Sequence, residues 1–274
     1  MPIWADPARG ERVRLLADDD MTLLATFVAP PSTRPTAADL RAVPGTDLAR
    51  LAEVALRDLP GVQVTTRSNE AEALASAGAT VQGTTVHLVR YRLREDPPPL
   101  PWASLRLSPG MEAVGIEAAD PDALAAAQRA AYGPGHPDHR ATLEAQETGV
   151  LEAMLAGELF GPVYPDASTL VLDEDGRIAA CLVATLWEGI GEEWSGGPWV
   201  IEVFKVPGAP RGLGRSLLER AVAVCALDDH SAVGLSVNGT NPARRHCERL
   251  GFRDAFSRVT LNLPGEWPAP PTPP

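Results

Sequence analysis

The chain has little positive charge and no long apolar run. Its 274 residues carry 24 Lys and Arg against 36 Asp and Glu, a net charge of −12, and Lys205 is the only lysine. Nucleic-acid backbones bind clustered cations, so this balance argues against a nucleic-acid partner. No stretch approaches the roughly 18 uninterrupted apolar residues of a membrane span, and no apolar run follows a basic start. We therefore expect a cytoplasmic protein with no membrane partner.

Cysteine is also scarce. The 3 cysteines, Cys181, Cys225 and Cys247, form no C-x-x-C pair, so neither a disulfide framework nor a zinc site is indicated. His136 and His139 lie in a Gly- and Pro-rich loop that supplies no third ligand, and we expect no metal. With 45% hydrophobic residues, the chain can bury a sizeable core, and its length suits two domains.

Residues 200–218, VIEVFKVPGAPRGLGRSLL, carry the strongest local pattern. The β-branched and aromatic residues up to Val206 predict a buried strand, and the leucines from Leu213 onward predict a helix. Between them, Gly212 and Gly214 let backbone N–H groups converge on an anion at the positive end of the helix. The spacing is neither that of a P-loop nor that of a dinucleotide fingerprint. A turn that needs glycine only for its geometry is the alternative.

This loop, Arg211-x-x-Gly214-x-Ser216, resembles the Arg/Gln-x-x-Gly-x-Gly/Ala loop of GCN5-related N-acetyltransferases (GNATs), which binds the pyrophosphate of acetyl-CoA. A short predicted strand, 234–237, then precedes NPARRHCERLGF, residues 241–252, which is similar to the family's Asn-x-x-Ala-x-x-x-Tyr-x-x-x-Gly-Phe signature. Here Asn and Ala stand one residue closer, and Cys247 occupies the tyrosine position. The resemblance implies an α/β fold with a mixed, mostly antiparallel central sheet flanked by helices.

The resemblance also implies acetyl-CoA as co-substrate and a set of positions that contact it. These are Phe204, Lys205, Val206, Arg211, Gly212, Leu213, Gly214, Arg215, Ser216, Asn241 and Cys247. Backbone N–H groups of residues 204–206 would serve the oxyanion and the pantetheine arm.

Glu202 is the first candidate for the catalytic base, because some small-amine acetyltransferases of this family carry a glutamate here. Burial near tryptophans raises the pKa of a carboxylate towards a useful range. A glutamate paired with an arginine on the sheet surface is the alternative, and His139 and Glu188 are the reserves. We expect that Cys247 does not protonate the leaving thiolate, because its side chain is much shorter than that of tyrosine. Water or another hydroxyl would then serve.

The segment 187–199 mixes Trp187, Trp194 and Trp199 with glutamates over a glycine-rich loop. Such a segment suits a pocket for a cation or an amine, and it suits the rim of a homodimer equally well.

The remaining elements follow the order of the GNAT fold. We predict a strand over 111–117, a helix capped by Asp120, a helix over 142–155, and a hairpin whose strands cover 168–172 and 177–186. In the N-terminal half we predict a strand over 21–28, a proline loop, then helix 46–59, strand 62–66, helix 69–77 and strand 84–93.

The N-terminal elements repeat the C-terminal order. Val64 aligns with Val237 and Gly78 with Gly251 at one offset, at which Ala38 and Arg41 replace Arg211 and Gly214. We interpret residues 1–100 as a degenerate half-domain of the same fold without a CoA site, although any α/β chain offers such coincidences. Residues 101–108 would be a linker, 109–263 the acetyl-CoA-binding domain, and 264–274 a disordered Pro-rich tail.

The favoured function is an acyl-CoA-dependent N-acyltransferase that transfers acetyl to a primary amine of a small molecule by direct attack. A non-catalytic acyl-CoA-binding module and a protein N-terminal acetyltransferase are the alternatives. The sequence does not indicate the acceptor, the acyl chain length or the oligomeric state.

Overall fold

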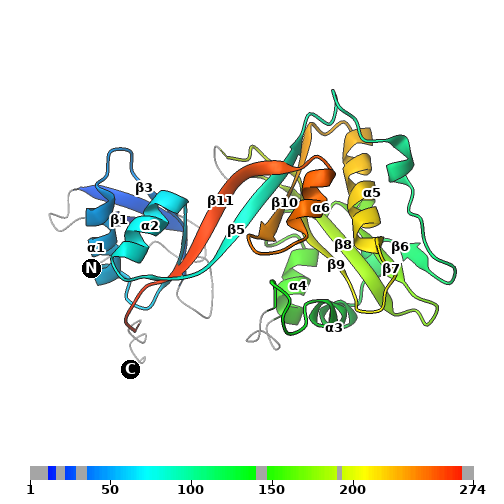
Figure 1. Ribbon diagram of the computed structural model, residues 1–274, viewed down its shortest axis with the longest axis horizontal. Coiled ribbons are helices and arrows are strands. Elements are labelled where there is room, and N and C mark those ends of the chain that lie inside the picture. Colours follow the sequence, from blue (N-terminus) through cyan, green and yellow to red (C-terminus); the bar gives the residue numbers. More distant parts are fainter. Residues whose placement is uncertain (1–11, 17–21, 29–35, 140–146, 190–192, 267–274) are drawn as a thin grey trace. The chain divides into compact units, whose positions relative to one another are not determined.

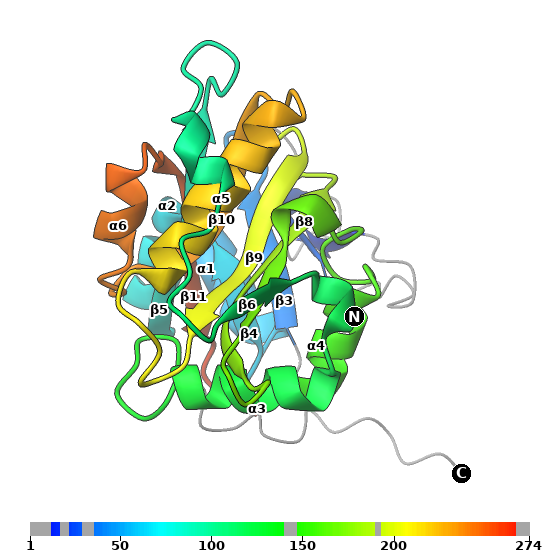
Figure 2. The same ribbon diagram turned by 90° about the vertical axis from the view of Figure 1, so that its right-hand side faces the viewer.

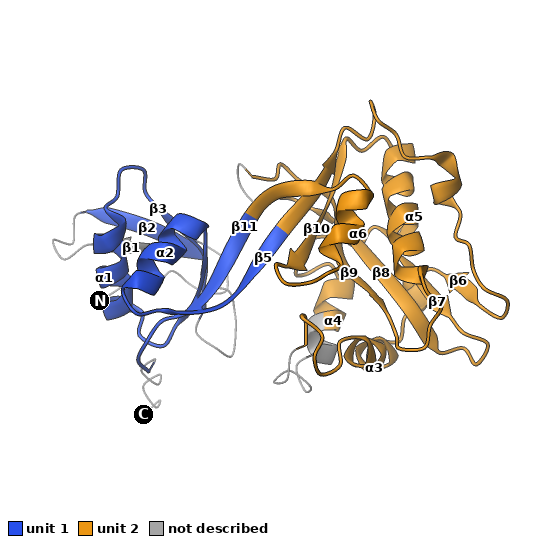
Figure 3. Cartoon of the chain, viewed as in Figure 1, with its two compact units in different colours: residues 1–86, 257–274 blue, residues 87–256 orange. Residues whose placement is uncertain are grey.

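The computed structural model describes residues 12–16, 22–28, 36–139, 147–189 and 193–266. The chain forms two compact units, residues 1–86 with 257–274 and residues 87–256 (Figure 3). Two strands, β5 (Thr80–Tyr91) and β11 (Arg253–Asn262), each begin in one unit and end in the other. No helix among the described residues is both long enough and apolar enough to cross a membrane.

The described part of the first unit contains a sheet in the order β1-β2-β3-β4-β11, together with the helices α1 and α2 (Figure 1). Its elements are β1 (Arg12–Leu16), β2 (Leu23–Val28), β3 (Thr36–Ala42), α1 (Leu48–Asp58), β4 (Gln63–Thr66) and α2 (Ser68–Ser76), with the first part of β5 and the last part of β11. β1, β2 and β3 pair antiparallel, β3 and β4 pair parallel, and β11 pairs antiparallel with β4. The core gathers side chains such as Leu40, Leu51 and Leu59, all at most 1% exposed.

Sequence patterns predicted both helices, β4, β2 and β5 to within a few residues, but they missed β1 and β3. β3 lacks a clear alternation because Asp39 interrupts it with φ 50° and a register shift. Met21 of the predicted strand and the proline loop up to Pro35 lie outside the described residues.

The second unit is a sheet in the order β11-β5-β10-β9-β8-β7-β6 with helices on both faces. Its elements are η2 (Leu100–Ala103), β6 (Glu112–Val114), η3 (Ile116–Ala118), α3 (Pro121–Ala131), α4 (Glu147–Leu155), η4 (Pro165–Ala167), β7 (Thr169–Leu172), β8 (Ile178–Trp187), β9 (Gly197–Lys205), α5 (Leu213–Leu227), β10 (Ala232–Asn238) and α6 (Arg244–Arg249). The fold class is therefore the predicted one, a mixed and mostly antiparallel sheet flanked by helices.

The alternating side chains of β8 fix which helices cover which face of this sheet. Cys181 and Val183 pack in one cluster with Leu124 of α3 and Met154 of α4. The residues between them point to the opposite face, where α5 lies across the strands (Figure 2). As predicted, Asp120 caps α3 by accepting a hydrogen bond from the Asp122 N–H at 3.1 Å.

The predicted element boundaries in the second unit compare with the structure as follows. β6 ends at Val114 and a 3₁₀ turn follows, so the strand is shorter than 111–117. The predicted hairpin strands match β7 and β8. Of the predicted helix 142–155, the first five residues lie outside the described ones, and α4 covers the rest.

The compact units also divide the chain differently from the predicted domains. Residues 87–108 belong to the second unit, where η2 packs against α5, so this proline-rich stretch does more than link. Residues 257–262 belong to the first unit through their pairing with β4. The predicted tail is partly anchored, since Pro264 O accepts a hydrogen bond from the Gly61 N–H at 3.1 Å, while 267–274 lie outside the described residues.

Both halves contain the order strand, helix, strand, helix, strand, and in both the first two strands are parallel. The turn after β3 is Val43-Pro44-Gly45, and the turn after β9 is also Val-Pro-Gly, residues 206–208. Gly45 has φ 86° and Gly208 φ 89°, and each turn closes with a bond from the following N–H to the valine carbonyl, at 3.0 and 3.2 Å.

This correspondence corrects part of the predicted alignment. Ala38 and Arg41 lie inside β3, paired with Val28 and Thr26, and so they are not counterparts of the loop residues Arg211 and Gly214. The counterpart of the loop is the shorter segment 43–47 that ends at Asp47. The alignment failed here because the two loops differ in length.

Candidate functional site

The N-terminus of α5 is open and uncapped. Gly212 precedes it in the left-handed conformation, φ 86°, which glycine adopts without strain, and no side chain accepts from the first turn. The first helical bond is Ser216 N–H to Gly212 O at 2.9 Å. By contrast, Asp47 and Asp120 cap α1 and α3 with their carboxylates. The α5 terminus thus keeps its N–H donors and its positive dipole end for an external anion.

The surroundings of Gly214 distinguish the two explanations for the glycines in this loop, which are the geometry of the turn and the close approach of a bound anion. It lies within α5, its φ is not positive, and a Cβ built on it would meet no atom within 4 Å. Neither backbone strain nor internal packing therefore requires glycine at this position. A ligand that approaches the backbone closely would require it, so the site fits a bound pyrophosphate.

The cationic side chains near the α5 N-terminus differ in whether they already have a hydrogen-bond or ion-pair partner. Arg211 is exposed, and its guanidinium has no hydrogen bond or ion pair with any described residue. Arg215 pairs with Glu219, with Nε and Oε1 2.8 Å apart. The Lys205 ammonium donates to Ala209 O at 3.3 Å and so braces the loop. Arg211 is the guanidinium that remains available to an anion.

β9 and β10 separate next to this loop. They pair only at Gly234 with Trp199 and at Leu235 with Val200, although β9 continues to Lys205. The Val206 N–H donates to Ala179 O of β8 at 2.9 Å, so it cannot serve an oxyanion as predicted. Because successive N–H groups of a strand point to opposite sides, the N–H groups of Val203 and Lys205 face away from β8.

Glu202 lies in a polar cluster at the part of β9 that does not pair with β10. A bulge at Ile201 interrupts the pairing with β8. The half-buried Glu202 carboxylate accepts hydrogen bonds from the Gln128 amide, from the Tyr132 hydroxyl, and from the Val203 N–H at 3.1 Å. Burial, helped by the Glu202 charge, raises the pKa of Tyr132 well above its usual range, so this phenol stays protonated.

The α3 end supplies these partners, and sequence reasoning missed them. Gln128 and Tyr132 are four residues apart at the end of α3, a spacing that places them on one helix face. That spacing is visible in the sequence, but nothing in the sequence indicates that this face meets Glu202.

The loop after Tyr132 contacts the second signature. Asn241, predicted to contact CoA, donates its amide to Asp138 Oδ2 at 2.6 Å and accepts from the Ala243 N–H at 2.8 Å. His139 is exposed, and its Nδ1 lies 2.8 Å from Tyr132 O. Glu188 is exposed beyond the hairpin end of β8, which pairs there with Gly197. The structure brings His139 near the Glu202 cluster but leaves Glu188 at the other end of β9.

The described residues contain no group of three His, Cys, Asp or Glu side chains that could hold a metal.

Neither a family model nor a curated protein sequence matches the chain. Several solved structures do. A GCN5-related N-acetyltransferase from Sphaerobacter thermophilus gives a TM-score of 0.60 at 18% identity, and the match covers 94% of this chain and 82% of the S. thermophilus chain. One from Kribbella flavida gives 0.54 at 16% identity, covering 95% and 92%. A tandem GNAT protein from the clavulanic acid biosynthesis pathway gives 0.50 at 17%, covering 88% and 78%.

The chain has the GNAT fold. The similarity to a tandem protein also agrees with the repeated element order of the two halves. At these identities the likeness concerns the fold, and the residues of this chain must carry any statement about activity.

Within this GNAT fold, Trp194 and Trp199 are core residues, so these two rings take neither role predicted for the segment 187–199, whereas Trp187 is only half-buried. They are 5% and 3% exposed and pack edge to face with ring centroids 5.2 Å apart. Trp199 also fits against Gly234, where any Cβ would overlap its ring. Buried rings form neither the exposed rim of a dimer nor the open wall of a pocket. Of the predicted glutamates, Glu192 lies outside the described residues.

Cys247 is 5% exposed, and burial raises the pKa of its thiol to about 11. Proton transfer from such a thiol to a thiolate with a pKa of about 8.5 is unfavourable. This direction agrees with the expectation that Cys247 is not the catalytic acid.

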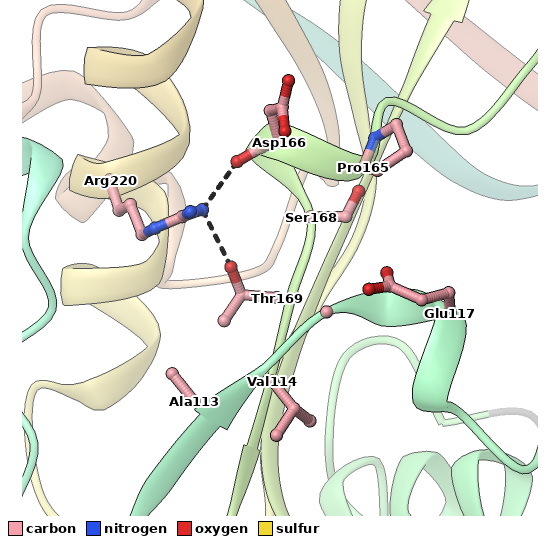
Figure 4. A pocket seen from close by; sticks show the side chains of 9 residues that line it. Ala113, Val114, Glu117, Pro165, Asp166, Ser168, Thr169 and Arg220 are labelled. Atoms are coloured by element: carbon pink, nitrogen blue, oxygen red, sulfur yellow. Dashed lines mark hydrogen bonds between the residues drawn. The ribbon is translucent and has the colours of Figure 1, made fainter.

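A separate hollow of about 270 Å³ lies at the β6 edge of the sheet, and Figure 4 shows the side chains that line it. Arg220 of α5 donates there to Asp166 O at 2.8 Å and to Thr169 Oγ1 at 2.9 Å. These bonds hold η4 and β7 to α5, and we interpret the hollow as structural.

Proposed function

We propose that the chain is an acyl-CoA-dependent N-acyltransferase that transfers acetyl from acetyl-CoA to a primary amine of a small molecule. The observation that carries the proposal is the uncapped N-terminus of α5, where Gly214 leaves open space and Arg211 has no partner among the described residues. Helix N–H groups and a free guanidinium together bind a pyrophosphate. The separation of β9 from β10 supports a pantetheine path beside them.

In this proposal, a named group takes part in each proton transfer and stabilises the charge that develops on the carbonyl oxygen. The Glu202 carboxylate takes the proton that leaves the amine nitrogen as the C–N bond forms. The C–S bond breaks with its electron pair going to sulfur, which takes a proton from water, and Glu202 then releases its proton to the solvent, so that no net proton is gained or lost. The Lys205 N–H, facing away from β8, donates to the carbonyl oxygen as negative charge develops on it. Gln128 and Tyr132 hold Glu202 in position through their hydrogen bonds.

A non-catalytic acyl-CoA-binding module is the second candidate, and two observations favour it. Cys247 replaces the family's tyrosine, and the Glu202 carboxylate already accepts three hydrogen bonds. Hydrogen bonds donated to the charged form of a carboxylate stabilise that form and make the carboxylate a weaker base.

Two measurements decide between the candidates. Calorimetry with acetyl-CoA tests binding, and release of free thiol in the presence of a broad panel of small amines tests turnover. We expect binding and amine-dependent thiol release. Binding without turnover on any amine supports the binding module, and no binding of acetyl-CoA or CoA rejects both. Turnover on peptide N-termini alone supports an N-terminal acetyltransferase.

We also propose that the first unit is a degenerate copy of the fold without a CoA site. At the offset that aligns Val43 with Val206, Asp39 falls on Glu202, and it is paired with Arg41 at 2.9 Å and Arg258 at 3.1 Å. The Asp47 carboxylate accepts from the Ala49 N–H at 2.9 Å and so occupies the end of α1 where a phosphate would bind. Both features oppose CoA binding and base catalysis in this half.

The proposed setting is cytoplasmic, without nucleic-acid or membrane partners, in keeping with the net charge of −12. Analytical ultracentrifugation decides between a monomer and a homodimer.

A further inference from the structure

A cavity of about 320 Å³ adjoins the N-terminal turn of α5 in the second unit. Its walls include Trp102, Ser104 and Arg106 from the stretch before β6, and Arg215, Ser216 and Glu219 from α5. Arg215 and Ser216 are also residues of the glycine loop motif. The cavity and the proposed pyrophosphate site therefore share two residues and lie side by side.

The lining of this cavity is cationic. Arg106 is exposed, and its guanidinium has no hydrogen bond or ion pair with any described residue. Arg215 donates from Nε to Glu219, which offsets one of the two positive charges, and its Nη donors have no hydrogen bond with any described residue. Arg106 is thus an uncompensated cation in a chain whose net charge is −12. An anion is the ligand that this arrangement favours.

Trp102 gives the cavity an aromatic wall, and the fold holds that ring in place. Arg90 of β5 lies over the indole, with the guanidinium carbon 5.4 Å from the ring centroid. Arg90 is itself only 8% exposed and donates to Leu250 O at 2.7 Å. A half-buried indole fixed in this way offers a preformed surface on which a flat heteroaromatic ring can stack.

We propose that this cavity binds the 3′-phosphoadenosine end of CoA. The inference rests on the proposed function. In CoA the pyrophosphate is joined directly to the 5′ carbon of a ribose that carries both adenine and the 3′-phosphate. A pyrophosphate bound at the α5 terminus therefore places the ribose next to it, beside the cavity that Arg215 and Ser216 also line. Arg106, with Arg215, binds the 3′-phosphate, and Trp102 stacks on adenine. Residues 101–106 are then part of the ligand site.

The test compares CoA with 3′-dephospho-CoA, which lacks only the 3′-phosphate. We expect the wild-type chain to bind CoA roughly tenfold or more tightly than 3′-dephospho-CoA in calorimetry, as one lost charge-assisted contact implies. Arg106→Gln should remove most of this preference, by weakening CoA alone. Arg177→Gln is the matched control, since Arg177 is an exposed arginine in the β7–β8 hairpin, far along the chain from the cavity.

Trp102→Ala should weaken both ligands by a similar factor, and Trp102→Phe should restore most of the loss, because a phenyl ring still stacks. If Trp102→Ala does not fold, Arg106→Gln alone decides, since Arg106 is exposed and its loss leaves the core intact. Adenosine 3′,5′-bisphosphate should compete with CoA in the wild-type chain and should compete less well in Arg106→Gln.

The outcomes separate the inference from the proposed function. Equal wild-type affinities for CoA and 3′-dephospho-CoA, or an Arg106→Gln variant that keeps the wild-type preference, would overturn the inference and leave acyl transfer standing. Absence of binding to either ligand overturns both.

Discussion

Glu202 is the side chain on which the proposed chemistry depends most. Glu202→Gln keeps the shape of the side chain, but an amide cannot accept the amine proton at neutral pH. We expect kcat to fall by roughly 10²- to 10⁴-fold, with little change in the KM for acetyl-CoA. Steady-state kinetics across pH provide the measurement, and the acidic limb of kcat/KM should disappear.

His139→Ala is the control for this prediction. The exposed His139 ring reaches Tyr132 O and makes no described contact with Glu202, so its loss should change kcat only slightly. A Glu202→Gln variant with the wild-type rate and pH profile would transfer the role of base to His139, Glu188 or water. Tyr132→Phe should lower kcat less than Glu202→Gln, because it removes the hydrogen bond from the phenol but leaves the carboxylate and its bonds to Gln128 and the Val203 N–H.

Cys247 should be chemically inert. Because burial raises the pKa of its thiol to about 11, the thiol stays protonated at pH 8, and reactivity should increase only as the pH approaches that value. Peptide-level mass spectrometry should find native Cys247 alkylated by iodoacetamide at least about 100-fold more slowly than in the denatured chain. Cys247→Ala should keep at least about a third of the wild-type kcat, since water can supply the proton. A loss of two orders of magnitude with normal CoA binding would make the thiol a catalytic acid.

Single residues were predictable where a local motif fixes their role. The loop from Arg211 to Ser216 lies at the start of α5 as its spacing predicted. The partners of Glu202 come from α3, far along the chain, and no local pattern reports such a contact. The burial of Trp199 was not predictable for the same reason, because it depends on β10 and on the space left by Gly234.

At the level of single elements, α5 differs from the capped helices α1 and α3 in how it begins. A carboxylate accepts a hydrogen bond from the first turn of α1 and of α3, whereas α5 begins after a left-handed glycine that follows Arg211. Gly214→Val should raise the Kd for acetyl-CoA by about tenfold or more, because the added methyls fill the open space beside the first turn. The variant should stay folded, since that space holds no protein atom within 4 Å.

Arg211→Ala tests the same terminus through charge. We expect a rise of roughly tenfold or more in the KM for acetyl-CoA from the loss of one charge-assisted contact. Arg177→Ala, in the exposed hairpin, should leave KM unchanged. Unchanged acetyl-CoA binding in both Arg211→Ala and Gly214→Val would remove the physical basis of the proposed site.

Elements with strong periodicity or caps were predictable, and irregular ones were not. Asp120 marks the start of α3 in the sequence as it does in the structure, and the predicted helix 46–59 agrees with α1 to within two residues at either end. β3 was hidden because Asp39 leaves the extended conformation and breaks the period of two. Residues 101–103 fall in the predicted linker, because prolines disfavour a sheet. Pro101 nevertheless suits the first turn of the 3₁₀ helix η2, which packs on α5.

In the molecule as a whole, the last strand of each half lies beside the strands of the other half. β11 pairs with β4, and β5 neighbours β10. A chain limited to residues 109–263 would therefore lack the β5 residues next to β10 and the β4 partner of β11. We expect this fragment to be poorly soluble in expression trials, because it exposes unpaired strand edges and apolar surface. A soluble, monomeric fragment that binds CoA with full affinity would contradict this account.

The stoichiometry of CoA binding tests the asymmetry between the two halves. The first unit keeps the strand, turn and helix order of the second and even its Val-Pro-Gly turn, but a carboxylate closes the end of α1. An aspartate placed there repels phosphate and already uses the first-turn donors. Calorimetric titration of the full chain with acetyl-CoA should therefore give one site per chain, and Arg211→Ala should weaken that site without uncovering another. Asp47→Ala should lower the stability of the first unit by about 0.5–2 kcal/mol through the lost cap and should leave the stoichiometry at one, because that loop has no counterpart of Arg211 or Gly214. A titration that reaches two equivalents in the wild-type chain would show that the first unit has kept a site.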